Sequence, residues 1–208
     1  GMVINSDGGC INLDNVTISD CEVGSQIVES YQLNIDLGTS VISGCTTGVK
    51  VAAGSSDNLI QNGTVSDNTG DGIRVEGEDE VPDENRFEKI EESNNFGNGI
   101  IFYDGFDNVV SNCLIRGNNS SESGETGYAG IAVLTGNTEI KWNTIEDNTC
   151  AGVYADEASS LEVSGNLIYG NSEGIKLSFT TNVKITSNTI TENQNGLVIG
   201  GGSAPAVL

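Results

Sequence analysis

A four-residue phrase recurs along most of this chain: a glycine is followed by an apolar residue, by a residue of any kind and by a second apolar residue. Seven clear copies and one degraded copy each follow an apolar marker residue. The markers are Ile18, Ile42, Val65, Ile90, Ile115, Ile145, Ile168 and Ile190. They lie 22 to 25 residues apart, with one gap of 30 residues. A fixed period of this length predicts a solenoid, in which each repeat forms one coil stacked on its neighbours.

The pattern inside each repeat indicates which kind of solenoid forms. Apolar and polar residues alternate over short runs, as in residues 182–185, and Gly, Asn, Ser, Thr and Asp separate the runs. This is strand periodicity broken by turns, and it excludes helical repeats. The leucine-rich framework, the six-residue period of left-handed β-helices and the Gly-Gly-x-Gly-x-Asp repeat are all missing. The sequence therefore predicts an all-β, parallel β-helix with roughly eight coils of about three short strands each, as a single domain over residues 1–208.

A polar position follows each marker by three residues. Its occupants are Cys21, Cys45, Asn68, Ser93, Asn118, Asn148, Asn171 and Asn193. Because equivalent positions of stacked coils lie above one another, these asparagines are expected to form a ladder in which each amide bonds to the next coil. The pattern predicts a ladder that is interrupted at Ser93. Such residues are needed to build a solenoid whatever its function is.

The phrase at residues 143–148, Asn-Thr-Ile-Glu-Asp-Asn, returns in variant form at residues 166–171 and 188–193. Together with the glycine phrase that follows each copy, it resembles the right-handed parallel β-helix repeat of the pectate-lyase-like superfamily. The resemblance implies lyases, hydrolases, epimerases, phage tailspikes, adhesins and non-catalytic carbohydrate-binding modules alike. It also implies an extracellular or cell-surface location, since most relatives are exported.

Charge and composition narrow the partners. The chain has 30 acidic and 8 basic residues and a net charge of −22, which argues against nucleic acid and permits cations or neutral and basic ligands. No apolar run is long enough to span a membrane. The chain has no histidine and no Cys-x-x-Cys motif, so zinc, haem and copper sites are disfavoured. Of its five cysteines, Cys21 and Cys45 are expected to stack closely enough for a disulfide to be considered.

Insertions that interrupt the repeat carry a cluster of acids. The segment 76–84 and the following coil's segment 103–107 leave the solenoid at one edge, and the carboxylates expected there are Asp79, Asp83, Asp104 and Asp107. Calcium takes six to eight oxygen ligands in loose geometry, so these four residues are candidate calcium ligands. The alternative is a solvated acidic surface.

The residue of any kind within the glycine phrase is expected to face solvent, because side chains alternate along a strand. It predicts one outward column of Lys50, Arg74, Ile101, Ala132, Tyr154, Lys176 and Val198. Aromatic residues of the neighbouring loops lie beside it. Cations, carboxylates and aromatic faces together are typical of a polysaccharide groove. The candidate ligand-binding residues are Lys50, Arg74, Tyr103, Phe106, Tyr154 and Lys176.

Three functions stay open at this point. The first is a non-catalytic carbohydrate-binding or cell-surface module that binds a polysaccharide or cell-surface glycan. The second is a calcium-assisted polysaccharide lyase, with Lys50 or Arg74 as the base, or a glycoside hydrolase. The third is a structural or adhesive spacer. The absence of histidine and of the galacturonan-hydrolase motifs favours the first. Neither end resembles a helical cap, so a tail strand, a partner domain, an oligomer or the remainder of a longer protein is expected to cover a solenoid end.

Overall fold

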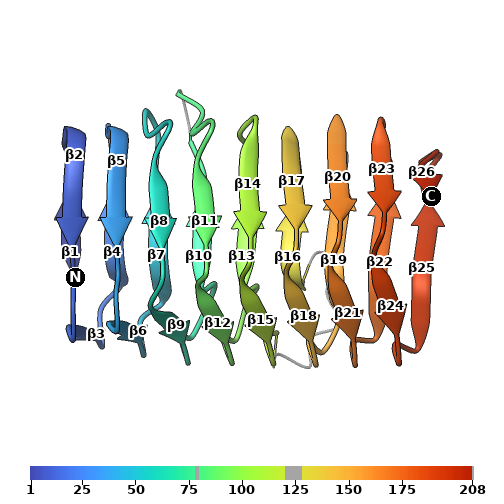
Figure 1. Ribbon diagram of the computed structural model, residues 1–208, viewed down its shortest axis with the longest axis horizontal. Helices are drawn as coiled ribbons and strands as arrows, with labels where there is room; N and C mark the ends of the chain where they lie inside the picture. The colour runs from blue at the N-terminus through green and yellow to red at the C-terminus, as the bar shows by residue number, and fades with distance from the viewer. Residues whose placement is uncertain (78–79, 120–127, 208) are drawn as a thin grey trace.

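The computed structural model describes residues 1–77, 80–119 and 128–207. The chain winds into a rod of stacked coils, with the N-terminus at one end and the C-terminus at the other (Figure 1). Its strands form three parallel sheets of nine, nine and eight strands, which run along the rod. The predicted all-β parallel β-helix is therefore confirmed, with about nine coils because a further turn precedes the first repeat.

Each of the first eight coils contributes one strand to every sheet, and the last turn contributes a strand to sheets A and B. Sheet A contains β1 (Met2–Ile4), β4 (Val23–Ile27), β7 (Thr47–Val51), β10 (Ile73–Val75), β13 (Ile100–Phe102), β16 (Ala129–Val133), β19 (Ala151–Asp156), β22 (Glu173–Ser178) and β25 (Asn195–Gly200). Sheet B contains β2 (Asp7–Asn12), β5 (Tyr31–Asp36), β8 (Leu59–Gln61), β11 (Arg86–Glu88), β14 (Asn108–Ser111), β17 (Asn137–Lys141), β20 (Ser160–Ser164), β23 (Val183–Thr186) and β26 (Ala206–Val207). Sheet C contains β3 (Thr17–Ser19), β6 (Val41–Ser43), β9 (Thr64–Ser66), β12 (Glu91–Ser93), β15 (Leu114–Arg116), β18 (Thr144–Glu146), β21 (Leu167–Tyr169) and β24 (Thr189–Thr191).

The interior of the rod is a continuous apolar core. The residues on both sides of the outward position in the glycine phrase point inward, as Ile73 and Val75 do on β10, and both are fully buried. Phe87 from sheet B meets Phe102 from sheet A edge to face, with ring centroids 5.9 Å apart. Within the described ranges, no helix has the length and apolar character needed to cross a membrane.

An asparagine ladder joins the coils at the turn between sheets C and A. Asn118 Nδ2 donates to Asn148 Oδ1 at 3.1 Å, and Asn148 Nδ2 donates to Asn171 Oδ1 at 3.0 Å. Two further ladders, which the sequence patterns did not reveal, lie at the other turns: Asn58 bonds to Asn85 between sheets A and B, and the third ladder lies between sheets B and C. All three satisfy buried backbone groups that turns would otherwise leave unpaired.

The prediction for the coil around β12 is wrong by two residues. Strand pairing places Glu92, not Ile90, between Val65 and Ile115 in the inward column of sheet C. The ladder position is consequently Asn95 rather than Ser93, and the ladder is not interrupted there: Asn95 bonds to the asparagines of both neighbouring coils. The misassignment has a physical origin, because a carboxylic acid is not expected in an apolar column.

Glu92 is wholly buried in the core. Its Oε2 accepts a hydrogen bond of 3.1 Å from Asn95 Nδ2, and its Oε1 has no partner among the described residues. Burial raises the pKa of Glu92 well above its ordinary value, although the bond from Asn95 lowers it. The acid fits because the residue beside it is Gly72, directly before β10, where a Cβ would overlap the carboxylate.

The five cysteines are free. Cys21 and Cys45 occupy the ladder column at its N-terminal end, where the backbone N–H of Cys45 donates to Asn68 Oδ1. Cys113 is buried in the core, and Cys10 is exposed.

Candidate functional site

The outer face of sheet A carries the predicted column of side chains. Strand pairing sets Arg74 beside Lys50 on one side and beside Ile101 on the other, and it continues the column through Ala132, Tyr154, Lys176 and Val198. The alignment of these residues is therefore as the sequence predicted.

The expectation that the whole column faces solvent is wrong for its middle. Ile101, Ala132 and Tyr154 are buried, and they pack with Ala129 and Ala151 of the same sheet. Tyr103 and Leu134 pack against this cluster from the next outward position along their strands. Neighbouring side chains on the outer face thus cover one another, and they form a second apolar cluster outside the coil.

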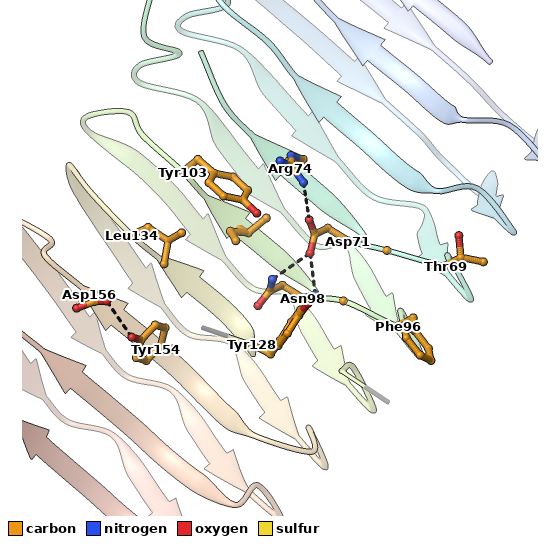
Figure 2. Close-up of a pocket in the computed structure, with 13 residues that line it drawn as sticks. Thr69, Asp71, Arg74, Phe96, Asn98, Tyr103, Tyr128, Leu134, Tyr154 and Asp156 are labelled. Atoms are coloured by element: carbon orange, nitrogen blue, oxygen red, sulfur yellow. Dashed lines mark hydrogen bonds and ion pairs between the residues drawn. The ribbon is translucent and has the colours of Figure 1, made fainter. Parts of the chain in front are cut away.

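A first groove lies over this cluster, with a volume of about 480 Å³. Ile101, Leu134 and Tyr154 form apolar parts of its lining, while Asp71 and Arg74 lie at one end (Figure 2). The residues come from strands β10, β13 and β19 and from the segments next to them, and Tyr128 and Leu134 flank β16 between the last two. The groove therefore runs across the strands, along the axis of the rod.

Asp71 organises the polar end of the first groove. Its Oδ1 accepts hydrogen bonds of 2.9 Å from both the backbone N–H and the side-chain amide of Asn98, and its Oδ2 lies 3.3 Å from Arg74 Nη1 (Figure 2). The side-chain oxygen of Asn98 in turn accepts the backbone N–H of Ala129 at 2.7 Å. Asp71 and Asn98 each directly precede the glycine of their own repeat phrase, and these hydrogen bonds hold both side chains in place.

Arg74 is held from three sides. Its Nε donates to Glu76 Oε2 at 2.6 Å, and its guanidinium carbon lies 4.3 Å from the centroid of the Tyr103 ring. The other oxygen of Glu76 pairs with Lys50 Nζ at 2.7 Å. One carboxylate therefore binds both cations of this region.

A second groove, of about 720 Å³, lies beside the first. Lys50, Glu76 and Asp104 line it, and Tyr103 lines both grooves. From β7 to β19 the two span four strand spacings, or about 19 Å, which is the scale of a short oligosaccharide.

The ion pairs set the protonation of Arg74, which lines the first groove, and of Glu76, which lines the second. Burial opposes the charge on Arg74, but the hydrogen bond to Glu76 and the neighbouring carboxylates outweigh it and raise the pKa of Arg74. Burial likewise opposes the charge on Glu76, but Lys50 and Arg74 lower its pKa. Arg74 is thus held protonated, which suits hydrogen bonding and does not suit proton abstraction.

Two of the three tyrosines that line the first groove, Tyr103 and Tyr154, stay neutral. Burial raises the pKa of Tyr103, and burial together with Asp156 raises the pKa of Tyr154 to about 12. The hydroxyl of Tyr154 donates to Asp156 Oδ2 at 3.0 Å (Figure 2). Lys176, a predicted binding residue, lines neither groove; its Nζ lies 5.9 Å from the Tyr154 ring centroid and 3.2 Å from Glu173 Oε2.

Of the predicted calcium ligands, Asp83, Asp104 and Asp107 lie in the turns that follow sheet A, and Asp79 lies outside the described residues. Asp104 accepts the backbone N–H of Gly77 at 2.9 Å, Asp83 accepts that of Phe106 at 2.8 Å, and Asp107 accepts the side-chain amide of Asn137 at 2.9 Å. No group of three acidic, histidine or cysteine residues suited to a metal is present in the described ranges. A calcium site that includes Asp79 stays a prediction.

A family model described as the right handed beta helix region matches residues 1–122 and 94–208. The chain belongs to this right-handed β-helix family. Its predicted handedness and its resemblance to pectate-lyase-like β-helices are thereby confirmed. A comparison with curated proteins found no match.

Solved β-helix structures share the fold at low sequence identity. The A-module of mannuronan C-5 epimerase AlgE4 from Azotobacter vinelandii matches with a TM-score of 0.76 and 19% identity, over 99% of this chain and 58% of that one. Pectate lyase Pel9A matches with a TM-score of 0.62 and 16% identity, over 92% of this chain and 55% of that one. XylC, solved in complex with xylose, matches with a TM-score of 0.70 and 14% identity, over 88% of this chain and 36% of that one. This chain therefore spans little more than half the length of these structures, or less.

Among the candidate binding residues, the structure brings together Lys50, Arg74, Tyr103 and Tyr154 along the two grooves. Phe106 is exposed and lines neither of them. Sequence reasoning missed Asp71, Asn98, Glu76, Leu134 and Asp156 as members of the site. The signal that could have found them is their spacing, since each lies two or three positions from the outward residue of its own strand.

Proposed function

We propose that this β-helix is a non-catalytic carbohydrate-binding module of an extracellular or cell-surface protein, and that a polysaccharide lies across the outer face of sheet A. The observation that carries the proposal is the position of Tyr103. Its ring packs against the Arg74 guanidinium and lines both grooves, so an apolar surface and charged groups meet where the two grooves adjoin.

This combination suits a sugar chain. A pyranose presents a C–H face that packs on aromatic and aliphatic surface, and hydroxyls at its edges that need hydrogen-bond partners. Ile101, Leu134 and Tyr154 supply apolar contact in the first groove. Neutral tyrosine hydroxyls and the carboxylates at the rim supply donors and acceptors.

The structural neighbours support a carbohydrate ligand. Two of them are a mannuronan epimerase and a pectate lyase, and a third was solved with xylose. Their identity to this chain is at most 19%, so this support rests on the shared fold alone.

The contacts of the proposed bases favour binding over catalysis. Lys50 and Arg74 both pair with Glu76, so neither is poised to take a proton from a sugar carbon. A calcium-assisted lyase would also need ligands in addition to Asp83, Asp104 and Asp107, which bond to amides instead of gathering around one point.

A panel of polysaccharides tests the proposal when each is scored for both binding and cleavage, with calcium and with a chelator. The expected result is saturable binding of at least one polysaccharide, independent of calcium and without release of reducing or unsaturated ends. Calcium-dependent release of unsaturated ends would replace the module with the lyase. Binding to no polysaccharide would leave a structural or adhesive spacer.

A further inference from the structure

The two grooves on sheet A carry an excess of negative charge. Six of the residues that line them are carboxylic acids and two are cations: Glu29, Asp71, Glu76, Glu80, Asp104 and Asp156, against Lys50 and Arg74. The remainder of the molecule does not offset this excess, since the chain carries a net charge of −22.

The two cations are not available to an incoming anion. Glu76 binds Lys50 at 2.7 Å and Arg74 at 2.6 Å, and Asp71 adds a second carboxylate to Arg74 at 3.3 Å. Tyr103 covers a face of the Arg74 guanidinium. A uronate carboxylate would have to displace these partners and approach the surrounding acids, and like charges at short range repel one another strongly at a partly buried site.

Asp156 adds an unsatisfied acceptor to the groove wall. Its Oδ2 accepts the Tyr154 hydroxyl, while its Oδ1 is enclosed and has no hydrogen-bond partner among the described residues. A ligand cannot reach the enclosed Oδ1, but Asp156 is half-buried and lines the groove, so a ligand that meets its carboxylate there must bring a hydrogen-bond donor. A protonated amine offers three donors and a positive charge.

We propose that the groove prefers glycans bearing free amino groups and rejects polyuronates. The inference rests on the proposed carbohydrate-binding function and names the ligand class for the same site. The aromatic and aliphatic floor contacts the sugar rings, and the carboxylates of Asp71, Asp104 and Asp156 face their ammonium groups. Specificity then comes from repulsion of anionic sugars as well as from attraction of cationic ones.

Calorimetric titration of the full chain with three oligosaccharides of equal length tests this charge preference. The probes are a glucosamine oligomer with protonated amines, its N-acetylated counterpart of the same backbone, and a galacturonate oligomer. The glucosamine oligomer is expected to bind about tenfold more tightly than the N-acetylated one, and this preference is expected to shrink as salt is raised. The galacturonate oligomer is expected not to bind.

A pair of variants separates local charge from total charge. Glu76→Gln removes the carboxylate that binds Lys50 and Arg74, whereas Glu139→Gln removes a carboxylate that pairs with Lys141 on sheet B at 2.6 Å. Each changes the net charge equally. Glu76→Gln is expected to weaken glucosamine binding about tenfold and to allow galacturonate binding, while Glu139→Gln leaves both within about twofold.

The outcomes distinguish this inference from the function on which it rests. If the galacturonate oligomer binds the parent protein as tightly as the glucosamine oligomer, the module still binds glycans and the charge preference is wrong. Equal binding of the acetylated and free-amine oligomers, or equal effects of the two variants, also overturns the preference. Binding of none of the three probes to a correctly folded protein refutes the preference, and if the polysaccharide panel is negative as well, the proposed function fails with it.

Discussion

Replacing Glu92 with isoleucine is expected to stabilise the protein at neutral pH. The acid lies in the inward column of sheet C between Val65 and Ile115, so Glu92→Ile restores the side-chain type that this column carries in other coils. The substitution removes the unpartnered Oε1 atom from the core. It also removes the bond from Asn95 Nδ2, but that amide keeps its bonds to Asn118 Oδ1 and to the backbone oxygen of Val65.

The magnitude follows from these contacts. A buried polar atom without a partner costs about 1–3 kcal/mol, and no donor is orphaned by the change. We therefore expect the free energy of unfolding to rise by about 1–3 kcal/mol at pH 7, which for a domain of this size raises Tm by about 2–4 °C per kcal/mol. Gly72 leaves room for the new side chain, because a β-branched residue packs beside the equivalent glycine at Gly48.

The effect depends on pH with a defined sign. The folded protein holds Glu92 protonated, because burial raises its pKa well above the ordinary value of 4.5, and the nearby Asp71 adds to the shift. The favourable contribution of this bound proton is complete below pH 4.5 and is lost as the pH rises toward the folded-state pKa. The advantage of Glu92→Ile over the parent should therefore grow between about pH 4 and pH 7.

Thermal unfolding followed by circular dichroism at several pH values measures this difference. Glu92→Gln keeps the polar shape and should abolish the pH-dependent part with a smaller gain in Tm. Glu91→Gln is the matched control, since Glu91 faces outward and pairs with Arg116 at 2.7 Å, and it should change stability by less than about 1 kcal/mol. A lower Tm for Glu92→Ile at pH 7, or a difference that does not vary with pH, would contradict the reasoning.

Three further predictions concern the solenoid itself. Asn148→Ala removes a rung whose amide and oxygen both bond within the buried ladder, and it should lower the free energy of unfolding in urea by about 2–4 kcal/mol. Gly130→Ala places a Cβ against a backbone oxygen and the asparagine ladder, and it should lower the free energy of unfolding by about 1–3 kcal/mol. At Gly196 a Cβ would have its nearest neighbour at 3.7 Å, so Gly196→Ala should change the free energy of unfolding by less than about 0.5 kcal/mol in the same assay. Burial raises the pKa of Cys113 to about 12, so its thiol should not react with a thiol reagent at pH 8, while exposed Cys10 reacts; labelling of Cys113 in the folded protein would refute this.

The repeat was sufficient to predict the fold because every coil buries apolar side chains at equivalent positions and pairs with its neighbours through equivalent strands. Alternation within the glycine phrase also placed Lys50, Arg74, Tyr154 and Lys176 in one column, as strand pairing confirms. The same reasoning failed at Glu92, because it required an apolar residue at the marker and so selected Ile90.

The site was less predictable than the column. Whether Ile101 is exposed depends on Tyr103 and on residues of neighbouring coils, and alternation along one strand carries no information about them. The ion pairs of Glu76 with both Lys50 and Arg74 depend on side-chain rotamers and on the distances between coils. Sequence spacing brings such groups near one another but does not say which of them pair.

The central claim, that a glycan binds over the outer face of sheet A, is tested most directly by one comparison of affinities. Tyr103→Ala removes the ring shared by the two grooves, and Trp142→Ala removes an aromatic side chain that is 62% exposed at the turn between sheets B and C. In calorimetric titration with the best polysaccharide of the panel, Tyr103→Ala should weaken binding by about 2 kcal/mol, or about 30-fold, and Trp142→Ala should leave it unchanged. Unchanged affinity of a folded Tyr103→Ala protein, or a greater loss in Trp142→Ala, would contradict the account.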